Sequence, residues 1–73
     1  MKSYFDSDNN SNIDTYEYGD DYISVRFKDG SVYTYTYMSA GSGAIEEMKR
    51  LADCGDGLNS YISRYKPPYQ SKT

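Results

Sequence analysis

Two runs of alternating apolar and polar residues, separated by Asp29-Gly30, occupy the middle of this chain. The first run, 22–28, has an apolar residue at every second position, and the second, 32–38, has a tyrosine at every second position. A period of two, with β-branched and aromatic side chains, predicts antiparallel strands. We therefore expect a β-hairpin over 22–38 that turns at Asp29-Gly30.

The length of this turn decides which way the hairpin tyrosines face. A two-residue loop would put Phe27 on the face opposite the tyrosines. A three-residue loop with a left-handed Gly30 places Val25 opposite Tyr33 instead. We choose the three-residue loop, because it separates an apolar face from a polar one, as a sheet covered by helices on one side requires. The tyrosine stripe is then mostly core.

Sequence signals on either side of the hairpin predict a third strand and two helices. Residues Ile13–Tyr18 have strand-like content and stop at Gly19, where a turn begins. Apolar residues recur at helical spacing over about 43–54 and again over about 58–66. The fold class that follows is α+β, in which a three-stranded antiparallel sheet is followed by two helices packed on one of its faces.

These elements delimit one small domain with an extension at each end. The domain spans 13–66, since a chain of 73 residues makes a single domain. Residues 1–12 are polar and predict a flexible acidic arm. Residues 38–43, rich in glycine and serine, predict a flexible connector. Residues 67–73, which begin with two prolines, predict a C-terminal tail.

Tyrosine replaces the usual aliphatic residues in the expected core. Ile, Leu, Val and Phe together make up only 10 of the 73 residues, fewer than a globular chain usually has, whereas tyrosine alone contributes 10. A buried tyrosine ring contributes about as much apolar area as phenylalanine and leaves a hydroxyl for the rim. We therefore expect a folded domain with a tyrosine-rich core.

The composition excludes several kinds of catalytic site. The chain has no histidine and one cysteine, Cys54. It therefore cannot build a Ser-His or Cys-His nucleophile pair, a histidine metal ligand or a cysteine zinc cage. Carboxylates are frequent, but no pair is marked by its spacing, so we expect no enzymatic activity. Cys54 follows Asp53 with no base nearby, which predicts a reduced structural thiol.

Negative charge is concentrated in the N-terminal part of the chain. The formal net charge is −3. Residues 1–30 carry three basic and seven acidic residues, whereas residues 31–73 carry five basic and four acidic ones. An acidic half repels a phosphate backbone. This distribution favours another protein as the partner, such as one with a basic nucleic-acid-binding groove.

The segment from Asp6 to Glu17 has the ligand spacing of an EF-hand calcium loop. Oxygen ligands stand at Asp6, Asp8 and Asn10, and Glu17 takes the twelfth position. However, Ser11 takes the sixth position, where glycine is usual, and only five residues precede the loop, too few for an entering helix. The alternatives are a helix-free calcium loop and an acidic, Asn-rich turn without a cation. No other cofactor is expected.

Three motifs occur in the order found in a known small module. They are Ile13 with Tyr18, the hairpin pattern from Ile23 to Tyr35, and Gly57-Leu58-Asn59 with Ile62. In this order they resemble the KTSC domain, which occurs alone in bacteria and phages and at the C-terminus of some lysyl-tRNA synthetases. The family's Val-Pro after its central Tyr-x-Tyr is missing here. The resemblance implies a small α+β fold without an established activity and, from the synthetase association, a suggestion of RNA binding.

The favoured function is a non-enzymatic protein-interaction module with an acidic surface. A phage-type inhibitor that mimics the charge of nucleic acid would have such a surface. Tyrosine and arginine are typical interface anchors, and acidic residues would meet a basic partner. The expected interaction residues are Tyr22, Arg26, Lys28, Asp20 and Asp21.

The alternative function is an RNA-binding accessory module. It requires tyrosines exposed for base stacking beside basic residues. The basic residues expected near them are Arg26, Lys28, Arg64 and Lys66. We rank this alternative second, because the chain is acidic and the expected tyrosine stripe faces the core.

The sequence also bears on location and assembly. No apolar run is long enough for a membrane helix or a signal-peptide core, so we expect no membrane contact and a cytoplasmic protein. An exposed edge strand would allow a homodimer as well as a monomer.

Overall fold

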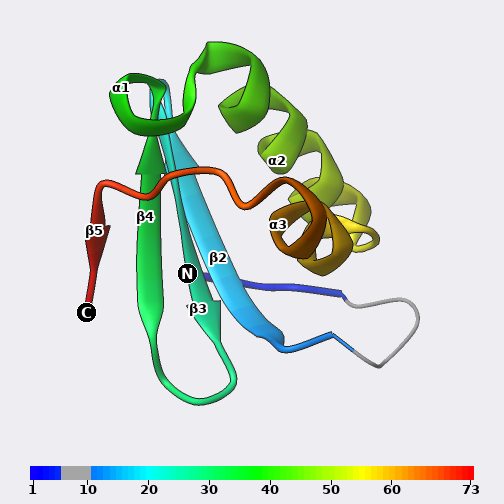
Figure 1. Cartoon of the computed structure of the whole chain (residues 1–73). Coiled ribbons are helices and arrows are strands. Elements are labelled where there is room, and N and C mark those ends of the chain that lie inside the picture. The colour runs from blue at the N-terminus through cyan, green and yellow to red at the C-terminus, as the bar shows by residue number, and fades with distance from the viewer. Residues whose placement is uncertain (6–10) are drawn as a thin grey trace.

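The computed structural model describes residues 1–5 and 11–73 (Figure 1). Within these residues the chain forms five strands and three helices. In chain order they are β1 (Lys2–Ser3), β2 (Ile13–Gly19), β3 (Tyr22–Phe27), β4 (Val32–Thr36), α1 (Tyr37–Ala40), α2 (Ser42–Cys54), α3 (Leu58–Tyr65) and β5 (Ser71–Lys72).

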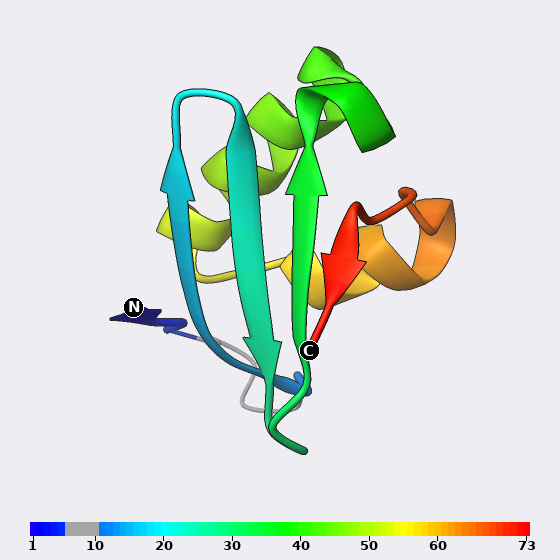
Figure 2. The same cartoon turned by 90° about the vertical axis from the view of Figure 1, so that its left-hand side faces the viewer.

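All the strands belong to one antiparallel sheet with the order β1-β2-β3-β4-β5. The helices lie on one face of this sheet and leave the other face open (Figures 1 and 2). The α+β class is therefore confirmed. The expected three-stranded sheet with two helices is wrong, because the described part of the chain has five strands and three helices.

The two additional strands lie at the edges of the sheet and come from the segments expected to be an arm and a tail. β1 pairs with β2, with Lys2 opposite Tyr16, and β5 pairs with β4, with Lys72 opposite Tyr33. Each additional strand has two residues, too few for a period to appear in the sequence. Backbone hydrogen bonds to a neighbouring strand specify them instead. Figure 2 shows the two ends of the chain at opposite edges of the sheet.

Side chains near each end of the chain anchor these edge strands to the core. The Tyr4 side chain is 6% exposed, and its hydroxyl accepts a hydrogen bond from the backbone N–H of Leu58 over 3.2 Å. Its ring meets the Tyr16 ring edge-on, with the centroids 6.5 Å apart. Pro67, which precedes β5, is also buried. The N-terminal segment thus contributes a residue to the core cluster.

The hairpin has the predicted three-residue loop. Val25 lies opposite Tyr33, and the backbone N–H of Phe27 donates to the Ser31 carbonyl over 2.8 Å. Gly30 has φ +94°, a left-handed conformation that side-chain-bearing residues rarely adopt. The predicted register is therefore confirmed, and it turns Val25 and Tyr33 toward the helices.

The core combines aliphatic residues with three buried tyrosines. Tyr35 is 2% exposed, and Tyr33 is half-buried against the same cluster. Tyr37, the last tyrosine of the stripe, leaves the sheet as the first residue of α1 and is 37% exposed. The buried core residues are Tyr4, Ile13, Tyr16, Ile23, Val25, Tyr35, Ile45, Met48, Ala52 and Leu58.

The segment expected to be a flexible connector contains the short helix α1. Thr36 and Ser39 form a reciprocal capping box, in which each side chain accepts a hydrogen bond from the other residue's backbone N–H over 3.0 Å. Gly41, at φ +90°, then turns the chain into α2. The connector prediction failed because serine and glycine signal helix caps as well as loops.

The two longer helices occupy the predicted ranges to within about one residue. α2 buries Ile45, Met48 and Ala52 on one stripe, and α3 buries Leu58. Gly55 ends α2 in a left-handed conformation, and its N–H donates to carbonyls of the preceding turn. None of the helices in the described ranges is long and apolar enough to cross a membrane.

Candidate functional site

The open face of the sheet is mainly hydroxylic. Ser24 and Thr34 lie opposite each other, and their side-chain oxygens are 2.8 Å apart. Tyr22 and Arg26 belong to the same face of β3, since they alternate with residues that face the helices. Tyr22 is half-buried and lies so close to Gly19 that a Cβ built there would be 2.5 Å from its ring. The hairpin tyrosines therefore form no stacking platform on this face.

The five predicted interaction residues do not form one surface. Tyr22 and Arg26 share the open face, and Asp20 and Asp21 are exposed in the turn that precedes β3. Lys28 follows the opposite end of β3. Each residue is accessible to some degree, but the length of the strand separates the aspartates from the lysine.

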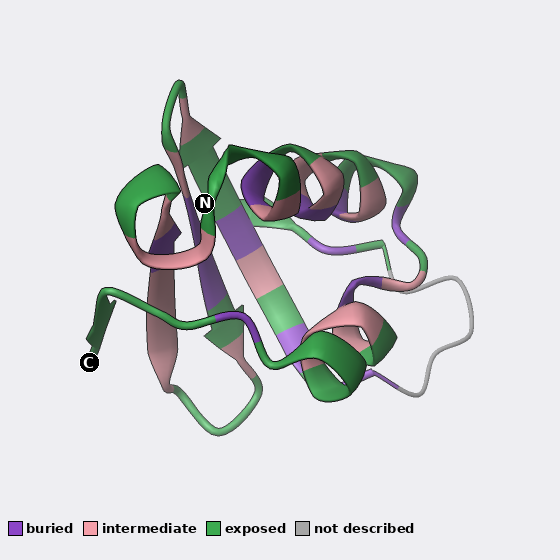
Figure 3. Ribbon diagram, turned by 45° about the horizontal axis from the view of Figure 1, so that its top comes forward, coloured by how far each residue is buried: buried purple, intermediate pink, exposed green. Residues whose placement is uncertain are grey.

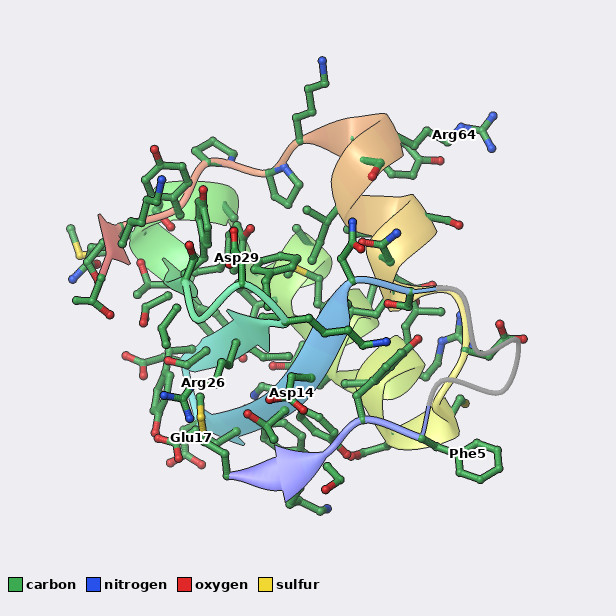
Figure 4. The ribbon with its side chains drawn as sticks, turned by 90° about the horizontal axis from the view of Figure 1, so that it is seen from below. Phe5, Asp14, Glu17, Arg26, Asp29 and Arg64 are labelled. Atoms are coloured by element: carbon green, nitrogen blue, oxygen red, sulfur yellow. The ribbon has the colours of Figure 1, made fainter. Side chains whose placement is uncertain are left out.

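Of the four basic residues named for RNA binding, Arg26 and Arg64 lie apart from each other. Arg26 lies on the open face diagonally across from Glu17, whereas Arg64 projects from α3 (Figure 4). Lys66 caps the C-terminal end of α3. Arg26 and Arg64 are therefore on different sides of the domain, whereas Lys28 and Lys66 line one cavity, which is described below.

The β2–β3 turn, α1 and the start of α2 meet at one end of the domain. The backbone N–H of Tyr37 donates to the Asp21 carbonyl over 3.0 Å, and the Tyr37 hydroxyl donates to Glu46 over 2.5 Å. Lys49 donates to the Glu46 carboxylate over 2.9 Å and to the Asp20 carbonyl over 3.0 Å. We call this cluster of Asp20, Asp21, Tyr37, Met38 and Glu46 the acidic tip.

Hydrogen bonds stabilise the charged form of the Glu46 carboxyl in the acidic tip. The hydrogen bond from Lys49, followed by the one from Tyr37, lowers the pKa of the Glu46 carboxyl. The same bond to Glu46 is the main reason that the pKa of Tyr37 is raised. Within the described part of the chain, neither the Asp20 nor the Asp21 carboxylate is in a salt bridge. The tip therefore has three carboxylates, those of Asp20, Asp21 and Glu46, and one lysine, Lys49, in contact with it.

Met38 projects into solvent from the acidic tip. Its side chain is 95% exposed, the highest value among the large apolar residues described. No residue of α1 is buried (Figure 3), although the Thr36–Ser39 capping box fixes its first turn. An exposed methionine beside a tyrosine on an ordered backbone is typical of protein contact sites, since both side chains supply large contact areas.

A second cluster joins β2 to α2 through Asp53. The Asp53 carboxylate accepts the Tyr16 hydroxyl over 2.7 Å and the Tyr18 hydroxyl over 2.5 Å, and the Lys2 ammonium lies 3.8 Å away. The bonds from Tyr18 and Tyr16 lower the pKa of Asp53. Burial, and then the bond to Asp53, raises the pKa of Tyr16 to about 12. The polar groups of these residues are paired with one another, so we interpret the cluster as structural.

A cavity of about 610 Å³ opens between the hairpin end, α3 and the segment leading to β5. We call it the aromatic pocket. Lys28 and Lys66 line it from the hairpin and from the end of α3, and Asp29 also lines it. Its apolar wall consists of Phe27, Tyr33, Tyr35, Ile62, Pro67, Pro68 and Tyr69.

The predicted calcium loop, Asp6 to Glu17, lies partly outside the described residues. Asp6, Asp8 and Asn10 lie outside the described residues. Glu17 is an exposed residue within β2, and its carboxylate lies 3.9 Å from the N-terminal ammonium of Met1. Among residues 1–5 and 11–73, no group of three or more His, Cys, Asp or Glu side chains could hold a metal ion.

Cys54 is a free, exposed thiol at the end of α2.

Comparison with known proteins adds no relative to this picture: no family model, no curated protein and no solved structure matches the chain.

Sequence reasoning did not find the acidic tip's methionine or the aromatic pocket. Met38 lay in a segment interpreted as a connector, and Tyr69 in a segment interpreted as a tail. The Asp53 cluster was also missed. Its available signal was the tyrosine pair at positions 16 and 18, whose spacing puts both hydroxyls on one face of β2.

Proposed function

We propose that this chain is a non-enzymatic protein-interaction module that docks through its acidic tip. The partner surface is basic and carries an apolar depression that accepts Met38. A nucleic-acid-binding groove has the required charge, so an inhibitor that occupies such a groove is the form of this function that we favour.

The observation that carries the proposal is the exposure of Met38 among acidic residues. A side chain that is 95% exposed contributes nothing to the stability of its own fold by burial. Its neighbour in the chain, Tyr37, donates its backbone N–H to the Asp21 carbonyl and its hydroxyl to the Glu46 carboxylate. An exposed apolar side chain in a segment bonded to acidic residues matches the general design of protein interfaces, in which a central contact supplies affinity and charged neighbours supply steering.

The ordered backbone of α1 supports the same proposal. The Thr36–Ser39 capping box and the bond from Gly41 N–H to the Tyr37 carbonyl fix this turn before any partner arrives. Binding by a preorganised surface loses less conformational entropy than binding by a flexible loop.

The test compares capture by the native chain with capture by variants of the acidic tip. We expect Met38→Ser, and separately the double change Asp20→Asn with Asp21→Asn, to weaken binding of the captured partner by about tenfold or more. Asp56→Asn, an exposed change beyond α2, is the control and should bind as the native chain does. Cross-linking and mass spectrometry identify the partner, and titration of the purified pair gives the affinities.

The double aspartate change tests the contribution of charge to binding, and the methionine change tests the contribution of apolar contact. Loss of the aspartates should reduce the salt dependence of binding, because fewer charges are screened. Loss of Met38 should leave the salt dependence intact while it speeds dissociation. Equal affinities for the native chain and both tip variants would place the contact on another surface.

RNA binding is the second candidate. Its direct test is a titration of labelled single-stranded RNA at low salt, where phosphate contacts are strongest. The ring arrangement on the open face does not favour it, because Ser24 and Thr34 occupy the centre of that face.

A further inference from the structure

The aromatic pocket has a mainly apolar interior and a charged rim. Its buried and half-buried lining residues carry apolar or hydroxylic side chains: Phe27, Ser31, Tyr33, Tyr35, Ile62 and Pro67. Its charged lining residues are all exposed and have both signs: Lys28, Asp29 and Lys66. Moving an unpaired charge into an apolar interior costs free energy. The interior of the pocket therefore favours a neutral molecule.

The hydroxyl of Tyr35 opens into this pocket. The other two buried tyrosines of the described residues, Tyr16 and Tyr4, use their hydroxyls in hydrogen bonds to Asp53 and to the Leu58 N–H. Tyr35 is 2% exposed, yet its hydroxyl makes no hydrogen bond to any residue that the structure describes. Every described side-chain N or O atom that is completely shielded from solvent has a hydrogen-bond partner. The Tyr35 hydroxyl is therefore not completely shielded, and it reaches open space in the pocket that Tyr35 lines.

This hydroxyl offers a hydrogen-bond donor to a ligand. Burial is the main reason that the pKa of Tyr35 is raised to about 12, so the hydroxyl keeps its proton at neutral pH. A sheltered donor that lacks a partner costs free energy, which an acceptor on a ligand would recover. A few placed polar groups in a mainly apolar interior are typical of small-molecule sites, where they fix the orientation of the ligand.

Aromatic rings form the wall around this hydroxyl. The Tyr33 ring is stacked beside the Tyr35 ring, with the centroids 6.4 Å apart. Tyr33 also meets Phe27 edge-on at 5.3 Å between centroids and Tyr69 edge-on at 4.8 Å. Tyr69 is 50% exposed and Tyr33 is half-buried, so part of each ring remains accessible. A planar ring that enters the pocket can add further edge-to-face contacts to this wall.

We propose that the aromatic pocket binds a small neutral aromatic molecule whose ring carries a hydrogen-bond acceptor. The ring packs among Tyr33, Tyr69 and Ile62, and the acceptor binds the Tyr35 hydroxyl. A cavity of about 610 Å³ lies in the range of roughly 300–1,000 Å³ that small-molecule sites occupy. This assignment uses none of the charged rim residues. It is also independent of the acidic tip, because the tip follows the end of β4 and the hairpin loop precedes its start.

The experiment titrates the native chain with three neutral compounds of similar size, followed by two-dimensional ¹H–¹⁵N NMR. Acetophenone has both a planar ring and a carbonyl acceptor. Ethylbenzene keeps the ring without the acceptor, and cyclohexyl methyl ketone keeps the acceptor without the planar ring. We expect acetophenone to shift amides in residues 27–35 and 62–69. It should bind about threefold or more tightly than cyclohexyl methyl ketone, because only acetophenone gains the ring contacts.

The role of the hydroxyl is tested with Tyr35→Phe, which keeps the ring. This change should weaken the binding of acetophenone about fivefold and alter the binding of ethylbenzene by less than about twofold. Comparing the two changes cancels the difference in hydration between the compounds. Tyr65→Phe removes the hydroxyl of a 62% exposed tyrosine that does not line the pocket, and it should bind all three compounds as the native chain does.

A second variant changes the wall of the pocket instead of the hydroxyl. Tyr69→Ala removes an exposed ring and should weaken the binding of both aromatic compounds about threefold or more. This variant keeps the test available if Tyr35→Phe does not fold.

Four results would overturn the assignment. One is the absence of shifts in residues 27–35 and 62–69 with all three compounds at millimolar concentration. Another is an equal loss of acetophenone and ethylbenzene binding in Tyr35→Phe, which would mean that the hydroxyl binds no acceptor. A third is equal binding of acetophenone and cyclohexyl methyl ketone, which would mean that no planar ring is recognised. The last is a shift of the same amides when the native chain alone is diluted, because a second copy of the chain would then occupy the pocket.

Discussion

The Tyr16 hydroxyl in β2 donates to the Asp53 carboxylate in α2 over 2.7 Å, across 37 positions of the chain. The Tyr18 hydroxyl, two residues further along the same strand face, donates to the second oxygen of that carboxylate. One carboxylate on the helix thus joins two rings on the sheet. The interaction links the layer of helices to the half of the sheet near β1.

This link predicts that the domain loses stability in acid. Hydrogen bonds from Tyr18 and Tyr16 lower the pKa of Asp53 in the folded state below its ordinary value of about 4. A group with a depressed folded pKa stabilises the fold above its unfolded pKa and loses that contribution as the pH falls through the folded pKa. Urea denaturation should therefore show the free energy of unfolding falling below about pH 4, with a smaller fall in Asp53→Asn.

The control for this measurement is Asp56→Asn, which removes a carboxylate of the same type just beyond α2. It should retain the acid dependence of the native chain. If Asp53→Asn also retains it in full, the bonds to the two tyrosines do not contribute to the acid dependence.

Burial of Tyr35 predicts a loss of stability in alkali. Burial is the main reason that the pKa of Tyr35 is raised to about 12 in the folded state. A raised folded pKa gives stability that is complete below the unfolded value of about 10 and is lost as the pH rises toward the folded value. The free energy of unfolding should therefore decline from about pH 10 to pH 12, and the decline should be smaller in Tyr35→Phe.

Circular dichroism follows unfolding in this experiment, and tyrosinate absorbance follows ionisation. Tyr65→Phe is the control, since this ring is 62% exposed. Identical alkaline slopes for Tyr35→Phe and the native chain would show that the Tyr35 hydroxyl is not shielded from water.

The left-handed conformation of Gly30 predicts a cost for any side chain at this position. A Cβ at Gly30 would touch no other group within 4 Å, so the expected effect of Gly30→Ala is backbone strain alone. We expect a loss of about 1 kcal/mol in the free energy of unfolding. Gly43→Ala is the matched control, because a Cβ there also meets nothing within 4 Å but the residue lies in α2. It should stabilise the chain by about 0.5 kcal/mol.

Urea denaturation measures both glycine variants. Because the two changes add the same methyl group in open surroundings, a Gly30→Ala chain at least as stable as the native chain would contradict the left-handed hairpin loop described here.

Tyr4 predicts that the first residues of the chain are part of the folding unit. Tyr4→Ala removes a core ring that is 6% exposed and should lower the free energy of unfolding by about 3 kcal/mol. Tyr4→Phe keeps the ring but removes the oxygen that accepts the Leu58 N–H, which should cost about 1 kcal/mol. Tyr65→Ala removes a largely exposed ring and should cost about 0.5 kcal/mol.

Thermal or urea unfolding of these variants gives the comparison. A Tyr4→Ala change no larger than that of Tyr65→Ala would mean that the N-terminal segment behaves as an arm, as its sequence predicts. Tyr4→Phe remains measurable even if Tyr4→Ala does not fold.

The sequence determined the elements that have a local period. The hairpin register was predictable because Gly30 specifies the loop and because only one register separates apolar from polar side chains. Helices α2 and α3 were predictable because their apolar residues recur on one stripe and glycines stand at their ends. The KTSC resemblance and the proposed functions stay predictions.

Only the tertiary structure decided the edges of the sheet and the candidate sites. β1 and β5 have two residues each, too few to show a period in the sequence. They form because β2 and β4 offer backbone groups at the sheet edges with which they can pair. The acidic tip joins Asp21 to Glu46, and the aromatic pocket joins Phe27 to Tyr69, which are contacts between segments far apart in the chain. Period and composition report the neighbours of a residue in sequence, whereas these sites depend on which segments the buried core brings together.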